Sequence, residues 1–245
     1  MTPGPSAAAS EAEREQEEET PRPRAGSARP SARAGLNRFV WDWQVEPIPA
    51  YPELKAWRAS RTYRVSPGRY QARLTVAGEV MVQPFEVLPD PRLQSDPAQN
   101  AAKQALLGAI KADTVAMLDA VQSMKAARAE LQASLADPSV ARSGKAKRAG
   151  QAIDKKLERW LDLTVEINDR HFVDPSHSSE RLDFNLLSVL AMVDTMDPPL
   201  TAGLIQRVGD VRAEWTRRRS EHEALLGEVS AFRRQWPTAT ASLMK

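Results

Sequence analysis

Two hydrophobic periods divide this chain. Within residues 35–92, apolar and polar residues alternate in the run from Tyr70 to Val76, which is typical of a strand with one solvated face, whereas the prolines of 46–57 predict a long loop. From about residue 96 onward, apolar residues recur in steps of three and four, which is typical of amphipathic helices. The pattern therefore predicts a mainly α protein with a small β part at its amino-terminal side.

The β part contains three predicted strands. The first is 36–43, where aromatic and β-branched residues are dense, and the others are 70–76 and 80–87, joined by an Ala77-Gly78 turn. Pro84 predicts a bulge or an edge position in the last strand. A three-stranded sheet with one apolar face needs a second layer, so the sequence predicts an incomplete sandwich.

The helical part contains four predicted helices. Their apolar stripes cover 107–135, 150–167, 182–196 and 204–236, with Thr201 as the N-cap of the last. We expect an antiparallel bundle of long helices, or a long helical hairpin braced by two shorter helices. The stripes select as helix core the positions Leu107, Ile110, Met117, Val121, Leu157, Trp160, Leu190, Val208, Trp215, Leu225 and Phe232.

The first 34 residues have a different composition from the rest. An acidic block at 11–19 is followed by arginines among proline, alanine, glycine and serine, with few apolar residues to form a core. This composition predicts a disordered, charge-segregated arm. A protein-binding or nucleic-acid-binding tail is the alternative function for it.

Composition excludes several kinds of chemistry. The 245 residues carry a formal net charge of +2 and include no cysteine, so disulfides, thiol nucleophiles and thiolate-bound zinc are excluded, and a polyanionic partner has little support. No apolar run resembles a secretory signal or approaches the length of about 20 residues that spans a membrane. As written, the sequence predicts a cytoplasmic protein with no membrane span.

The common catalytic motifs are missing from the sequence. It contains no HExxH, no GxSxG and no GxGxxG after a predicted strand. Gly144-Lys145 is not a phosphate-binding loop, because Ser139 stands where the earlier glycine is needed and Ala146 replaces the metal-binding hydroxyl residue. We therefore predict no cofactor and no catalytic residue.

Two weak candidate sites remain. His171, Asp174 and His177 have side chains that zinc prefers, but their irregular spacing among prolines and serines favours a polar interhelical loop. Trp41, Trp43 and Trp57 could stack on sugar rings, although core packing is the more common role of strand aromatics.

Two basic runs and one histidine favour structural roles. The runs 145–148 and 217–219 lack neighbouring aromatics, so a solvated helix face is favoured over contact with nucleic acid. His222 lies on the apolar stripe of the last helix, where a core or boundary histidine is the ordinary interpretation.

Four segments carry a resemblance to a known family. They are GLNRFVWDW, VSPGRYQARLTVAGE, FEVLPDPRL and LDFNLLSVLAMVDTMDPPLTAG. Over about residues 35 to 236 the chain resembles the C-terminal region of large bacterial glycosyl-hydrolase-like proteins with sortilin-type, BNR-repeat β-propellers. In that family an immunoglobulin-like sandwich follows the propeller, and a helical hairpin region follows the sandwich. The resemblance implies a partial immunoglobulin-like β module at 35–92 and a helical bundle at 93–245, which follow the arm at 1–34 that the composition predicts.

The resemblance also bears on function. The propeller, its Asp-box repeats and the opening strands of the sandwich have no counterpart in this sequence, which is compatible with a split gene, a truncated reading frame or a decayed copy. We expect a non-catalytic accessory region that packs against the propeller of another chain. The resemblance also implies that proteins of the parent family are exported. The alternatives are a helical interaction protein that forms a homodimer through its heptad stripes, and a carbohydrate-binding module.

Overall fold

The computed structural model describes residues 32–49, 51, 61–93, 96–165 and 181–238. It divides into two compact units, Met1–Asp42 and Trp43–Lys245, which we describe separately. The acidic block, Trp57 and the cluster of His171, Asp174 and His177 lie outside the described residues.

The described part of the first unit, residues 32–42, is irregular. The Asn37 side chain donates to the Arg33 and Gly35 carbonyl oxygens and closes a local turn. Phe39 and Val40 are exposed, and no strand forms here, so the first predicted strand is wrong. A strand needs a partner ladder and a continuous extended backbone. The run instead ends at Trp43, which has a φ of +64° and leaves the extended region.

The sheet is one antiparallel hairpin of β1 (Gly68–Val76) and β2 (Glu79–Val87). Ala77 and Gly78 both have positive φ, which gives the two-residue turn whose twist matches paired strands. The register is continuous from the turn to the Gly68 and Val87 pair, without a bulge at Pro84. The described sheet therefore has two strands rather than the expected three, and Pro84 lies on an edge.

Two hydrogen-bonded segments, residues 43–48 and 61–65, precede the hairpin and are called the strap below. The Val45 and Ile48 N–H groups donate to the Tyr63 and Arg61 carbonyl oxygens at 3.0 and 2.7 Å, and Val65 donates back to Trp43 at 2.8 Å. Ile48 and Tyr63 are buried in the same hydrophobic cluster as the helices. The strap is therefore part of the core.

Five helices follow among the described residues, and side-chain caps fix most of their starts. Asp96, Asp137, Ser143 and Thr201 each accept a hydrogen bond from a first-turn N–H, which confirms Thr201 as the predicted N-cap. The helices are α2 (Pro97–Ala136), α3 (Pro138–Ala141), α4 (Gly144–Thr164), α5 (Leu182–Thr195) and α6 (Ala202–Gln235).

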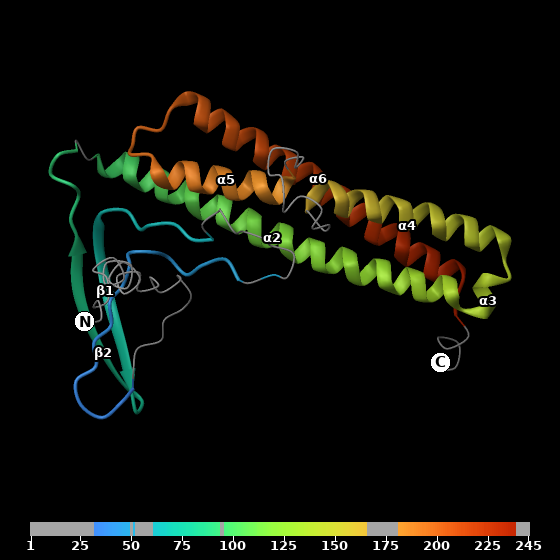
Figure 1. The fold of residues 1–245 in the computed structure, drawn as a ribbon, viewed down its shortest axis with the longest axis horizontal. Coiled ribbons are helices and arrows are strands. Elements are labelled where there is room, and N and C mark those ends of the chain that lie inside the picture. The colour runs from blue at the N-terminus through green and yellow to red at the C-terminus, as the bar shows by residue number, and fades with distance from the viewer. Residues whose placement is uncertain (1–31, 50, 52–60, 94–95, 166–180, 239–245) are drawn as a thin grey trace, which may run out of the picture. The chain divides into compact units, whose positions relative to one another are not determined.

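Side-chain contacts give the helix directions. Asp113 bonds Arg212 and Ser123 lies against His222, both at the same sequence offset, so α2 and α6 run parallel. Arg128 of α2 bonds Asp154 of α4, and Lys103 near the start of α2 bonds the end of α5. Figure 1 shows α4 and α5 following one another along α2 and α6. The helices therefore form a bundle with three legs, in which α2 and α6 contact each other directly and α4 and α5 together make the third leg. The two longest helices are parallel rather than paired as a hairpin.

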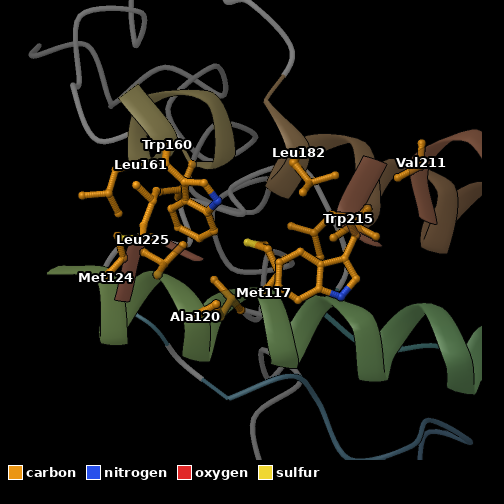
Figure 2. Close-up of a cluster of buried hydrophobic side chains, with 14 of the residues drawn as sticks. Met117, Ala120, Met124, Trp160, Leu161, Leu182, Val211, Trp215 and Leu225 are labelled. Carbon is orange, nitrogen blue, oxygen red and sulfur yellow. The ribbon is translucent and has the colours of Figure 1, made fainter. Parts of the chain in front are cut away.

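The buried core runs between these helices. Figure 2 shows Met117, Ala120 and Met124 of α2 facing Trp160 and Leu161 of α4 and Trp215 of α6. All the positions that the stripes selected as helix core, from Leu107 to Phe232, are buried. Because this burial occurs within one chain, the stripes are already covered without a second copy.

Candidate functional site: the β-hairpin

The hairpin is fixed to the bundle at its base. The Ser66 N–H and hydroxyl both donate to Gln104 Oε1 of α2 at 3.0 Å, and the Tyr70 hydroxyl donates to the Ser66 carbonyl. On the other strand, Val87 is buried. The base of the hairpin is therefore held by backbone and side-chain bonds at the start of α2.

Two cations, Arg64 of the strap and Lys103 of α2, bind carbonyl groups at the end of α5. The Asp194 carbonyl accepts from Arg64 Nη2 and from Lys103 Nζ, both at 2.9 Å, and Lys103 Nζ also donates to the Met196 carbonyl at 2.6 Å. Positive charge is favourable at a helix C-terminus. Burial lowers the pKa of Lys103, while the Asp194 charge opposes that shift. These contacts join three segments at the base of the hairpin.

The two faces of the hairpin differ in composition. Tyr70 stacks on Phe85 with ring centroids 5.9 Å apart, on the face that also carries Leu74 and Met81. Leu74 and Met81 are 52% and 53% exposed. The hairpin therefore presents apolar side chains to solvent, although a sheet normally buries such a face.

The opposite face is mixed. It carries Arg69 and Arg73 from β1, and Val80, Val82 and Glu86 from β2, all exposed, with Glu86 directly opposite Arg69 and Val82 opposite Arg73. The arginines are four residues apart, which is two repeats of the strand pleat, so both point to the same side. This arrangement places two arginines along β1, and two valines and one glutamate along β2.

Two of the tryptophans proposed for sugar binding fall within the described residues. Trp41 is partly exposed in the first unit, and Trp43 is 54% exposed in the second. Trp43 is held by its backbone bond to Val65. Trp57 and the candidate metal ligands His171, Asp174 and His177 lie outside the described residues.

No group of three or more metal-binding side chains occurs among the described residues. Within that part of the chain, no helix has the length and apolar character needed to cross a bilayer. Arg69 and Arg73 were not among the candidate residues predicted from the sequence, although their spacing of four in an alternating run is the signal that places both on one face.

A half-buried histidine lies between three helices. His222 Nε2 of α6 is 3.3 Å from Ser123 Oγ of α2, and its ring centroid is 5.5 Å from that of Trp160 on α4. Burial lowers the pKa of His222, and the charge of the adjacent Glu223 opposes this shift. The folded state therefore favours the neutral imidazole.

We expect this histidine to make stability depend on pH. Because the folded pKa is depressed, the contribution is fully present above the unfolded pKa of about 6.5 and is lost as pH falls through the folded pKa. Urea unfolding at a series of pH values should show this loss, and the variant His222→Gln should show a smaller one over the same range. Equal pH dependence in both proteins would contradict the assignment.

Tyr51, which follows the first segment of the strap in the sequence, is hydrogen-bonded to the middle of α2. The Tyr51 hydroxyl donates to Asp119 Oδ1 at 2.6 Å, and this bond raises the pKa of Tyr51 to about 12. We expect Tyr51→Phe to lower the free energy of unfolding by about 1 kcal/mol, since one hydrogen bond is lost. Urea unfolding measures this, and Asp119→Asn should retain part of the bond. No change in Tyr51→Phe would show that the contact is not stabilising.

Comparison with known proteins gives no relative. No family model matches the chain, and neither a curated protein nor a solved structure matches it.

Proposed function

We propose that this chain is a non-catalytic accessory module in which the helical bundle holds out a β-hairpin that strands of a partner complete. The observation that carries the proposal is the contrast between a filled helical core and a hairpin whose apolar residues are exposed. A two-stranded hairpin is only marginally stable alone in water, and a sheet with an apolar face needs a second layer.

The partner that we propose is the β-propeller part of a glycosyl-hydrolase-like protein. This choice rests on the sequence resemblance, in which the strands missing here belong to an immunoglobulin-like sandwich next to the propeller. In this proposal, β1 and β2 supply two strands of that sandwich and the partner supplies the rest. The bonds of Ser66 and Arg64 to the bundle support it, because they keep the hairpin base in place before a partner binds.

The test is complex formation with a sortilin-type propeller protein that retains its opening sandwich strands but lacks its own C-terminal region. Size-exclusion chromatography with light scattering should show a one-to-one complex with the full chain. The variant Met81→Asp should abolish it, whereas Ile205→Asp should not, because Ile205 of α6 is equally exposed at 54% but lies off the hairpin. Absence of a complex, or equal loss in both variants, would overturn the proposal. Glycoside cleavage by the chain alone would overturn its non-catalytic part.

A second candidate function is carbohydrate binding. The exposed indole of Trp43, with its backbone fixed by Val65, favours this function because sugar rings stack on exposed aromatic faces. Tryptophan fluorescence should then change on addition of oligosaccharides, and Trp43→Ala should remove that change. An unchanged spectrum with the full chain would exclude this function for Trp43.

A further inference from the structure

The two outer edges of the hairpin are not equivalent. The two-residue turn makes Val76 and Glu79 a hydrogen-bonded pair, and pairs then alternate along the register. The backbone groups of Arg69, Gln71, Arg73 and Thr75 therefore point away from β2, and those of Val80, Val82, Pro84 and Glu86 point away from β1.

The β2 edge is blunted. Pro84 has no N–H and lies in the middle of this outward row, so a strand added there would lose a central ladder bond. Proline on an exposed strand is a common device that prevents edge pairing. The β1 edge has no proline, its residues 71–76 are exposed, and among the described residues β1 pairs with β2 alone.

Charge identifies the kind of strand that fits the open edge. Arg69 and Arg73 lie on one face of β1, four residues apart, and neither has an ion pair among the described residues. On the β2 side, Arg69 lies opposite Glu86 and Arg73 lies opposite Val82, so Arg73 has no carboxylate opposite it in the hairpin. A strand paired along β1 would place two of its residues directly opposite these arginines. Opposite charges at such positions stabilise pairing and like charges destabilise it.

The apolar face of the hairpin determines which residues the partner strand needs between its two acidic positions. Positions facing Tyr70, Ala72 and Leu74 would meet the apolar side of the hairpin, where Leu74 is half exposed. The complementary strand therefore alternates apolar residues with polar ones and carries acidic side chains four residues apart. A second copy of this chain does not meet this requirement, because pairing through β1 of both copies would gather their arginines on one face.

We propose that the outer edge of β1 is the docking edge of this protein, and that it accepts an alternating apolar and acidic β-strand from a partner, bound by backbone pairing with carboxylates opposite Arg69 and Arg73. This inference rests on the proposed function and specifies the edge and the chemistry of the partner strand. Strand addition of this kind takes affinity from the backbone and specificity from alternate side chains.

The absence of cysteine from the sequence allows a direct test by disulfide tethering. The full chain with Gln71→Cys is equilibrated in a thiol redox buffer with the peptide TVEVCVEVT, whose palindromic order matches either strand direction. Its glutamates then lie opposite Arg69 and Arg73. The control peptide TVKVCVKVT reverses the charge. We expect the mixed disulfide with the glutamate peptide to be favoured roughly tenfold over that with the lysine peptide.

Two matched sites separate strand pairing from simple charge attraction. Val82→Cys places the thiol on the β2 edge two residues before Pro84, and Ser220→Cys places it on α6 directly after the exposed Arg219 and three residues after the exposed Arg217. At both sites we expect a smaller ratio of mixed disulfide with the glutamate peptide to mixed disulfide with the lysine peptide than at Gln71→Cys. Equal preference at Ser220→Cys, or no preference at Gln71→Cys, would overturn the proposal.

The outcomes also distinguish this inference from the proposed function. Capture of the peptide at Val82→Cys but not at Gln71→Cys would show that the hairpin docks strands through the other edge, so only the edge assignment would fail. Capture at neither site would count against both. A homodimer of the full chain that Arg73→Pro dissociates would assign the β1 edge to a second copy and overturn the acidic strand as its occupant.

Discussion

Replacing Trp160 with alanine is expected to lower the free energy of unfolding by about 3 to 5 kcal/mol, the usual loss for a large buried aromatic side chain. Trp160 is 2% exposed on α4, and its indole N–H donates to the Arg218 carbonyl of α6 at 2.9 Å. Figure 2 shows its ring within the core cluster, near Leu161 and Leu225. Urea unfolding followed by circular dichroism measures the loss, and a variant as stable as the parent would contradict this packing.

A second tryptophan provides the matched control for the hydrogen bond. Trp215 is also 2% exposed, but its buried indole nitrogen has no hydrogen-bond partner among the described residues. Trp160→Phe and Trp215→Phe remove similar ring area, yet only the first removes a bond. Trp160→Phe loses a hydrogen bond, whereas Trp215→Phe removes an unpaired buried donor, whose burial itself costs about 1 to 3 kcal/mol. We therefore expect Trp160→Phe to be the more destabilising variant by about 1 to 3 kcal/mol. Equal losses would show that the bond to Arg218 contributes nothing.

The helix core could be predicted from the sequence because its signal is local. A stripe such as Leu107 and Ile110 or Trp215 and Leu225 depends only on the helical period, which fixes the face that each side chain shares. The direction of the helices was less accessible. α2 and α6 are parallel because α4 and α5 both run antiparallel to α2. Periodicity within a helix does not show whether the next helix reverses direction.

The same dependence on local signals explains why the hairpin was predicted correctly and the strand at 36–43 was not. The Ala77-Gly78 turn sets its own geometry through two positive φ values, so the hairpin follows from adjacent residues. Residues 36–43 have strand composition, but a strand also needs a distant ladder partner, and composition does not supply one. Aromatic and β-branched residues such as Phe39 and Val40 are therefore exposed in irregular backbone.

The candidate site lay partly within reach of the sequence. Alternation from Tyr70 to Val76 predicted an apolar face, and the turn length determines which backbone groups point outward. That the face is exposed could not be predicted, since burial depends on what packs against a sheet rather than on the sheet itself. The different character of the two edges became visible only when the register placed Pro84 opposite Gln71.

Replacing Gly150 with valine is expected to lower the free energy of unfolding by about 2 to 3 kcal/mol, because α4 approaches its neighbours closely at this residue. A β-carbon on Gly150 would lie 2.5 Å from Leu135 Cδ2 and 3.0 Å from Phe232 Cζ. These contacts come from the end of α2 and the end of α6, so the side chain would separate two helix pairs at once. The usual gain from removing a helical glycine is smaller than this overpacking.

A glycine on α6 gives the control of opposite sign. A β-carbon on Gly227 would meet nothing within 4 Å, and the residue is exposed within the helix. Gly227→Ala should therefore raise the free energy of unfolding by about 0.5 to 1 kcal/mol, since alanine loses less backbone entropy on folding. Both variants can be compared by urea unfolding in the same buffer. Stabilisation by Gly150→Val as well would show that α2, α4 and α6 do not converge at this residue, and the helix arrangement described above would have to be revised.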